Sequence, residues 1–317
     1  MTLIVSKEGT GDYRMVNDAL NALSTGGGTI IIKEGVYKEK ISVEKPNVTL
    51  QGEGQVALTF DDCAKKKFSN GDEYGTFNSA SFYVSGCNFS AYNITFENAS
   101  GSGSVAGQAL ALYTNGDKQK FYQCRFLSFQ DTVFTAPKPP TRIDGSIADD
   151  AQRLTHPPEA YRIYFEDCYI EGDVDFIFGG ASVYFYRCEI FSKYRESDPC
   201  GYITAANTAG DQAFGFVFNE CTLTSDCPPN SVYLGRPWRN DAHTAFINCS
   251  MGAHIKPEGW HNWNKPDAEK TVRYEEYGST GPGGEMRGRV SWSKRLTAEE
   301  AERYTVHHVL KGFEVQK

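Results

Sequence analysis

Two aspartates interrupt apolar stretches of the 317-residue chain. Asp175 stands within "VDFIFGG" (174–180), and Asp131 stands within "LSFQDTVF" (127–134), directly after Gln130. A carboxylate in apolar surroundings must be ion-paired, hydrogen-bonded or protonated, because leaving it charged and unpaired costs several kcal/mol. We therefore expect other parts of the chain to supply partners for both carboxyl groups.

An amide and a guanidinium occur in comparable settings elsewhere in the sequence. Gln108 heads the apolar segment "GQALALY" (107–113), and Arg236 precedes a proline and Trp238 in "YLGRPW" (233–238). Singly, such residues are more often turn caps or solvated loop side chains. Together with two carboxyl groups they provide a nucleophile, an acid–base group, donors for an oxyanion and a cation that orients the nucleophile. That combination indicates ester hydrolysis without a serine nucleophile.

Other chemistries find no support in the sequence. The chain contains no GxSxG, HExxH or P-loop motif. The segment "GEGQVA" (52–57) matches the loose dinucleotide-binding pattern, but no helix with an apolar face follows it. Closely spaced Cys or His pairs, which metal sites need, are missing, and the net charge of −8 argues against nucleic acid. We expect no cofactor, no metal and no nucleic-acid partner.

A recurring pattern around cysteine indicates the fold. Each copy has an apolar residue, two variable residues, a cysteine, one variable residue and an apolar residue, and successive cysteines are 37, 44, 20, 33 and 28 residues apart. A unit of varying length that keeps one register is typical of a solenoid. The strand period places the first apolar residue out of phase with the cysteine, so a bend must separate them. The copies are 84–89, 121–126, 165–170, 185–190, 218–223 and 246–251.

These units predict an all-β chain, a parallel β-helix that forms a single domain over residues 1–317. Helical periodicity is found near the ends, over 16–23 and 297–312, and we expect these helices to cap the open ends of the solenoid. Stacked coils would align the cysteines in an internal column. We expect free thiols there, with disulfides between coils as the alternative.

The sequence also bears on membranes and compartments. No window of about 18 consecutive apolar residues is present, so we expect no membrane span. The first residues lack the basic flank and apolar region of a secretory signal, and an odd number of cysteines, nine, fits a reducing compartment. We expect a cytoplasmic protein and a monomer. The alternative is a secreted protein whose signal lies outside the given sequence.

Several short strings, taken in order, resemble the pectin methylesterases (pectinesterases), and the resemblance runs from about residue 3 to residue 312. It implies a right-handed parallel β-helix and metal-independent demethylation of methyl-esterified homogalacturonan, as polymer or oligomer, with release of methanol. The strings are "GVYKEK", "GTFNSASF", "GQALALY", "QDTVF", "DFIFG", "LGRPW", "GWHNW" and "EYGSTGPGG".

The resemblance also implies a role for each candidate residue. Asp175 is expected to be the nucleophile that attacks the methyl-ester carbonyl, and Asp131 the acid that protonates methanol and then activates water. Gln108 and Gln130 would stabilise the negatively charged oxygen, and Arg236 would hold Asp175 ionised and aimed. For these roles the pKa of Asp131 should be raised by its apolar setting, and that of Asp175 lowered by the guanidinium.

Substrate contacts are implied in the same way. Trp238 and Trp260 are expected to form an aromatic floor for sugar rings, with Thr76 and Phe176 as further contacts. Asp173 shares strand parity with Asp175 but matches no catalytic position of the family. We interpret Asp173 as a turn residue.

One departure from the family concerns the spacing of the two aspartates, which are 44 residues apart where the family has a shorter link. The extra segment, 136–160, is rich in Pro, Asp and Ala and is expected to leave the chain beside the cleft. It would wall one end of the cleft and favour short or chain-end substrates. The alternative is a tolerated surface loop.

Three other functions compete with the esterase hypothesis. The first is a β-helical esterase or thioesterase that acts on a different acyl substrate. The second is a non-catalytic carbohydrate-binding or structural β-helix, against which the combination of carboxyl, amide and guanidinium groups argues. A pectate lyase or polygalacturonase would share the fold, but the sequence shows no calcium-type carboxylate cluster.

Overall fold

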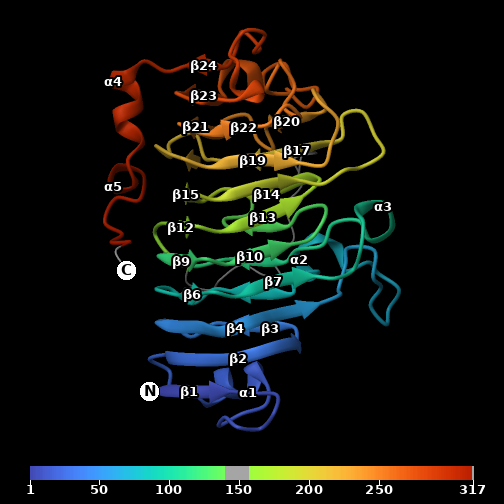
Figure 1. The fold of residues 1–317 in the computed structure, drawn as a ribbon, viewed down its shortest axis with the longest axis vertical. Helices are drawn as coiled ribbons and strands as arrows, with labels where there is room; N and C mark the ends of the chain where they lie inside the picture. Colours follow the sequence, from blue (N-terminus) through green and yellow to red (C-terminus); the bar gives the residue numbers. More distant parts are fainter. Residues whose placement is uncertain (140–156, 316–317) are drawn as a thin grey trace.

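Parallel strands stack along one axis of the molecule in a computed structural model that describes residues 1–139 and 157–315 (Figure 1). Seven strands of the described residues form one sheet, whose neighbours are all parallel. Its strands are β3 (Ile41–Val43), β5 (Phe82–Val84), β8 (Leu112–Thr114), β11 (Val133–Thr135), β14 (Val174–Gly179), β17 (Gly201–Ala206) and β20 (Val232–Gly235).

A second, 17-stranded sheet forms the remaining faces of the solenoid, and its strands also pair in parallel, for example β12 with β15 and β15 with β18. The predicted parallel β-helix is confirmed. These strands are β1 (Thr2–Val5), β2 (Gly28–Lys38), β4 (Val48–Phe60), β6 (Ser90–Tyr92), β7 (Thr95–Asn98), β9 (Gln119–Tyr122), β10 (Arg125–Leu127), β12 (Arg162–Glu166), β13 (Tyr169–Gly172), β15 (Ser182–Tyr186), β16 (Glu189–Ser192), β18 (Phe216–Asn219), β19 (Thr222–Ser225), β21 (His243–Ile247), β22 (Ser250–Met251), β23 (Arg273–Tyr277) and β24 (Lys294–Arg295).

Identical side chains stack in register inside the solenoid. Phe165, Phe185, Phe218 and Phe246 pair directly across four coils, with ring centroids 4.9, 4.4 and 4.5 Å apart. Near-parallel rings at this spacing add favourable contacts to the burial of their area. Such columns explain how units of unequal length keep one register.

The cysteine column is confirmed as free thiols. Every described cysteine is a free thiol. The cysteine of the first motif copy, Cys87, is half-buried, and those of the other five copies are buried: Cys124, Cys168, Cys188, Cys221 and Cys249. Each donates its S–H to backbone carbonyls. The residue before each of these cysteines has a φ of 50–55°, which makes the predicted bend; these residues are Gln123, Asp167, Arg187, Glu220 and Asn248.

The N-terminal helix α1 (Val16–Ala22) lies at the first coil and contacts β1, β2 and β3, as a cap should (Figure 1). Short helices also occur in the loops that follow some of the strands. They are α2 (Gly75–Asn78), α3 (Gly103–Ala106), η1 (Ala268–Lys270) and η2 (Pro282–Gly284).

The expectation of one C-terminal capping helix over 297–312 is wrong. The capping box forms, because Thr297 and Glu300 exchange backbone-to-side-chain hydrogen bonds of 2.9 and 3.2 Å, but Thr305 is extended and interrupts the helix. The pieces are α4 (Ala298–Ala301), η3 (Glu302–Tyr304) and α5 (Val306–Val309). They run back along the side of the solenoid, away from its open end (Figure 1).

An apolar strip explains this C-terminal path. Val309, Leu310 and Phe313 are buried in a cluster with tyrosines of the large sheet, among them Tyr184, whose hydroxyl donates to the Tyr304 carbonyl at 3.0 Å. Burying these side chains against the sheet removes their apolar area from water and so stabilises the segment along the side of the solenoid.

Among the described residues, no helix is long and apolar enough to cross a membrane. Most of the segment 136–160 lies outside the described residues, so its predicted position beside the cleft stays a prediction.

Candidate active site

An aromatic patch covers the outer face of the seven-stranded sheet. Phe134 and Phe178 have ring centroids 4.9 Å apart, and Trp238 lies 5.7 Å from Phe178. Phe77 joins the patch at 4.9 Å from Phe134. The patch places apolar rings beside the strands that carry the predicted catalytic residues.

Asp175 lies on an irregularity of β14. The register to β17 pairs Val174 with Tyr202 but Ile177 with Thr204, so β14 holds one extra residue between these pairs. Asp175 has a φ of 49°, a conformation that Asp tolerates better than most residues. A bulge of this kind re-aims side chains, which explains how Asp175 can leave the interior within a strand whose neighbours are all buried.

Arg236 holds the carboxylate of Asp175. It follows β20, two coils away, and donates from Nε to Oδ1 at 2.8 Å and from Nη2 to Oδ2 at 2.7 Å. The guanidinium itself lies between the rings of Tyr202 and Trp263, with its central carbon 3.9 Å from each ring centroid. Two hydrogen bonds and two stacked rings leave the carboxylate one orientation.

Asp131 lies beside Asp175 in the adjacent coil. Its backbone N–H donates to the carbonyl of Val174 at 3.0 Å, and its φ is 64°. The side-chain amide of Gln130 acts on the Asp131 carboxyl and slightly lowers its pKa. The two carboxyl groups are therefore brought together although 44 residues separate them.

The two carboxyl groups differ in their proton affinity. Burial, the nearby charge of Asp175 and that of Asp173 raise the pKa of Asp131 well above its usual value, and Arg236 opposes this only in part. This environment favours the protonated form of Asp131, as predicted. Asp131 is thus suited to donate a proton.

The prediction of a lowered pKa for Asp175 is wrong in sign. Burial raises the pKa of Asp175 above its usual value, and the opposing effects of Arg236, Lys265 and Arg195 are smaller. Arg236 acts in the expected direction, but desolvation of the buried carboxylate outweighs it. Asp175 still has the closer cation of the two aspartates, so it is the one suited to be ionised.

Gln108 lies one coil before Gln130. The amide of Ala109 donates to the Gln130 carbonyl at 3.1 Å, which fixes the two glutamine segments side by side. Both side chains are half-buried at the same edge of the sheet. Their positions are consistent with amide donors beside the carboxyl pair.

Comparisons with known proteins agree with this geometry. The family model "Pectinesterase" matches residues 2–139 and 153–313. The chain is 35% identical to "Pectinesterase 31" from Arabidopsis thaliana, over 96% of this chain and 90% of the relative. It is 34% identical to "Probable pectinesterase/pectinesterase inhibitor 17" from the same plant, over 98% of this chain but only 57% of the relative. The chain belongs to the pectinesterase family.

Solved structures give the same result. The pectin methylesterase from carrot superposes with a TM-score of 0.81 at 30% identity, covering 98% of this chain and 93% of that one. A pectin methylesterase solved in complex with a hexasaccharide gives 0.80 at 27% identity, covering 99% and 98%. The right-handed parallel β-helix expected from the resemblance is confirmed.

Two substrate contacts expected for a pectinesterase are wrong. Trp260 is only 1% exposed, stacks on Tyr274 with ring centroids 4.0 Å apart, and donates from Nε1 to Glu276 at 3.1 Å. Phe176 is fully buried in the interior core. Neither side chain can contact a sugar ring, because both are buried in the interior core of the solenoid.

Trp238 and Thr76 stay predicted substrate contacts. Trp238 is half-buried in the aromatic patch, and Thr76 precedes Phe77 at the edge of that patch. Asp173 is buried and accepts a 2.7 Å hydrogen bond from the Val174 amide, as expected of a turn residue. Its charge nevertheless acts on Asp131.

Sequence reasoning missed Trp263 and Tyr202, the two rings that enclose Arg236. Trp263 is the second tryptophan of "GWHNW" (259–263) and has a φ of 55°. Its side chain packs against the aromatic patch, whereas that of Trp260 lies in the interior core. The string "GWHNW" indicated that a tryptophan lies at the site. Which of its two tryptophans does so depends on which one faces the exterior of the sheet, and the sequence does not show this.

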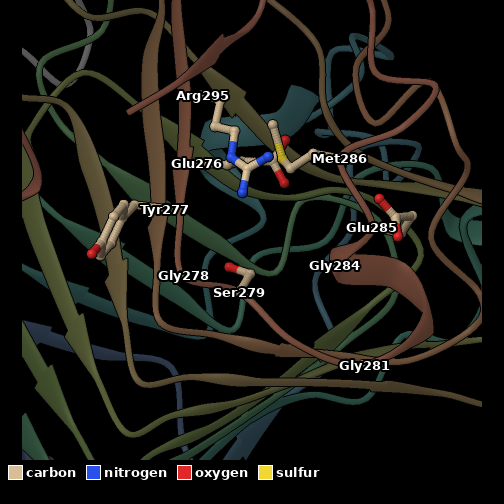
Figure 2. Close-up of a pocket in the computed structure, with 9 residues that line it drawn as sticks. All are labelled: Glu276, Tyr277, Gly278, Ser279, Gly281, Gly284, Glu285, Met286 and Arg295. Atoms are coloured by element: carbon tan, nitrogen blue, oxygen red, sulfur yellow. The ribbon is translucent and has the colours of Figure 1, made fainter. Parts of the chain in front are cut away.

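A pocket of about 290 Å³ lies elsewhere, near the C-terminal end of the solenoid. Its lining residues come from β23, η2, β24 and the segments between them, and none of the predicted site residues is among them (Figure 2). One of its two glutamates, Glu276, accepts hydrogen bonds from Arg289 at 2.9 Å and from Trp260 at 3.1 Å. The candidate active site is therefore the Asp131–Asp175–Arg236 cluster, away from this pocket.

Proposed function

We propose that this chain is a pectin methylesterase that hydrolyses the methyl esters of galacturonan through an aspartyl acyl-enzyme. The observation that carries the proposal is the paired environment of two carboxyl groups. Asp175 is held by two hydrogen bonds from Arg236, while Asp131 lies beside it and retains its proton to a higher pH. Environments that separate the proton affinities of two carboxyls assign the base and the acid.

The first half-reaction uses Asp175 as the nucleophile. A carboxylate oxygen of Asp175 attacks the ester carbonyl carbon, and the carbonyl oxygen becomes an oxyanion. Side-chain amides of Gln108 and Gln130 donate hydrogen bonds to that oxyanion. Collapse of the intermediate breaks the bond to the methoxy oxygen, Asp131 transfers its proton to that oxygen, and methanol leaves.

The second half-reaction restores the enzyme. Asp131, now a carboxylate, takes a proton from a water molecule as the water oxygen attacks the acyl carbonyl. The bond to Asp175 breaks, the galacturonate carboxyl is released, and Asp131 holds the proton again. Arg236 stabilises Asp175 as a leaving carboxylate in this step, through the same two hydrogen bonds.

The substrate follows from the surface around the cluster. Trp238 and Thr76 lie on or beside an aromatic patch on which sugar rings can stack, and a structural relative has been solved with a hexasaccharide. Lys265 and Arg195 add positive charge near Asp175, which suits an anionic galacturonan despite the net charge of −8. We propose a monomer that acts on galacturonan chains or oligomers.

The proposed substrate bears on the compartment. Methyl-esterified galacturonan is a polymer of cell walls, so the secreted alternative agrees with this function better than the cytoplasmic expectation does.

The experiment measures methanol release from methylated galacturonan oligomers by wild type, Asp175→Asn and Asp175→Ala. Asn removes the nucleophile but keeps an oxygen that accepts a hydrogen bond from Arg236. Ala removes both, and so also leaves a buried cation without a partner. We expect both variants to be inactive, with the Asn variant retaining the wild-type circular dichroism spectrum and melting temperature. Methanol release by Asp175→Asn at more than a trace would overturn the assignment. A wild type that cleaves only other esters would favour the esterase alternative.

A further inference from the structure

Lys265 anchors the chain segment that follows Arg236. Its Nζ donates to the carbonyl of Pro237 at 2.8 Å and to that of Trp238 at 3.2 Å. These are the next two residues after Arg236 in the chain. A single side chain thus fixes the backbone that carries the guanidinium.

The same lysine shares an aromatic ring with Arg236. Lys265 Nζ lies 4.5 Å from the centroid of Trp263, and the central guanidinium carbon of Arg236 lies 3.9 Å from it. One indole therefore contacts both cations. Movement of Lys265 would release the ring that holds Arg236 in place.

Charges on neighbouring elements act on Lys265. Burial, Arg239 and Arg236 lower the pKa of Lys265 to about 8, while Asp175 opposes them. In return, the charge of Lys265 lowers the pKa of Asp175. His261 also lies on this loop, but burial lowers its pKa below the usual value, so it is neutral at pH 8.

An ordinary explanation would be that Lys265 is a structural clamp of a surface loop. Lys45 is such a clamp, since its Nζ donates to the carbonyls of Leu20, Asn21 and Leu23 at the N-terminal cap. Lys265 differs from Lys45 in two ways. The residues whose carbonyls it holds directly follow Arg236 in the chain, and its charge lowers the pKa of Asp175.

We propose that Lys265 is a positioning residue for the reaction: it holds Arg236 in the geometry that orients Asp175, and its charge supports the ionised nucleophile. The proposal rests on the function proposed above. Loss of the lysine would lower kcat with little change in KM, because Lys265 contacts the protein rather than the substrate. Above pH 8, loss of its charge would slow the wild type in the same way.

The experiment compares Lys265→Met, Lys265→Arg and the matched control Lys45→Met. We measure kcat and KM for methanol release between pH 4 and pH 10. We expect Lys265→Met to lose roughly 10- to 100-fold in kcat, the range for a hydrogen bond to a charged group, and its acid limb to move to higher pH. Lys265→Arg should restore most of kcat and move the alkaline limb upward, because guanidinium stays charged. Lys45→Met should match wild type in kcat and pH profile.

A second readout needs no substrate. Tryptophan fluorescence of the wild type should change near pH 8, when the cation over Trp263 is lost, and the change should be absent from Lys265→Met and Lys265→Arg. A wild-type kcat and pH profile in Lys265→Met, or a persisting fluorescence change, would overturn the proposal. If Lys265→Met does not fold, Lys265→Arg tests the proposal instead. An alkaline limb at the wild-type pH, or a fluorescence change that persists near pH 8 in this variant, would overturn it. Failure of the esterase function would show instead as an active Asp175→Asn, and the fluorescence titration would still decide the role of Lys265.

Discussion

Asp131 and Asp175 lie in adjacent coils and differ in their access to positive charge. Arg236 donates two hydrogen bonds to the Asp175 carboxylate, whereas Arg236 acts on Asp131 only through its charge, and the side-chain neighbour of Asp131 is the neutral amide of Gln130. Burial raises the pKa of both, and that of Asp131 further because the charge of Asp175 adds to it. The environment of Asp175 therefore suits a nucleophile, and that of Asp131 suits an acid.

This asymmetry predicts a bell-shaped pH profile. The rate should rise as Asp175 loses its proton, at a pH above the usual Asp value, and fall at alkaline pH as Lys265 and Asp131 lose theirs. Arg236→Gln should move the acid limb to higher pH, because Arg236 lowers the pKa of Asp175. The measurement is kcat/KM for methanol release against pH. An acid limb that is unchanged in Arg236→Gln would contradict the assignment of that limb to Asp175.

Asp131→Asn should lose activity and gain stability. We expect roughly a 10²- to 10⁴-fold loss of kcat, as for other acid–base groups. A carboxyl group whose pKa is raised by folding binds its proton more tightly in the folded state than in the unfolded state. The free energy of unfolding therefore falls as pH rises from the unfolded pKa through the folded one. Asn has no proton to lose, so the variant should melt higher than wild type at pH 7.

The control for that prediction is the same comparison at pH 3, where Asp131 is protonated in both states. The stability difference between Asp131→Asn and wild type should there be much smaller. An Asn variant that melts lower than wild type at both pH values would show that Asp131 stabilises the fold.

Trp263 and Trp260 should differ in what their removal costs. Trp263→Ala removes a ring on which Arg236 lies, and we expect about a 3- to 30-fold loss in kcat, the range of one cation–π contact. Trp260→Ala empties a buried site and should lower the free energy of unfolding by about 3–5 kcal/mol. Chemical denaturation and methanol release measured on both variants separate the two roles. An unfolding cost for Trp263→Ala as large as that for Trp260→Ala would contradict this division.

Tyr304 should hold the C-terminal segment to the solenoid. Its hydroxyl donates to Glu275 Oε2 and lies 3.4 Å from Nε2 of the buried His243. Tyr304→Phe leaves the Glu275 carboxylate short of a donor, at a cost of about 1–3 kcal/mol in unfolding free energy. Hydrogen exchange in α4 and α5 should become faster, with kcat unchanged because the segment lies on another sheet from the active site.

The exposed His307 on α5 provides the control for Tyr304→Phe. His307→Ala should leave both stability and exchange near wild type. The effect of Tyr304→Phe should also depend on pH. Hydrogen bonds from His243 and Tyr304 help to lower the pKa of Glu275, so the stability they provide is present above its unfolded pKa and is lost as pH falls through the folded one.

Much of the fold could be predicted because it is encoded by local repetition. The motif around Cys124, Cys168 and Cys188 repeats an apolar position, a bend and a buried thiol, and each coil needs only its neighbour to bury them. The path of residues 297–312 could not be predicted in this way. It depends on an apolar strip formed by Tyr122, Tyr164 and Tyr184 from three different coils.

The candidate catalytic residues were also accessible from the sequence, since apolar surroundings marked Asp131 and Asp175 as unusual and the family resemblance gave them roles. The tryptophans were not. Trp260 and Trp263 are three residues apart in one loop, and no periodicity tells which one faces the core.

By itself, the sequence determined the repeating coil, the buried thiols and the set of groups able to hydrolyse an ester. Only the tertiary structure decided how those groups act on one another. The bulge in β14 turns Asp175 toward Arg236, and burial there outweighs the guanidinium in setting the pKa of Asp175. Desolvation and orientation depend on everything packed around a side chain, and that packing joins segments far apart in the chain.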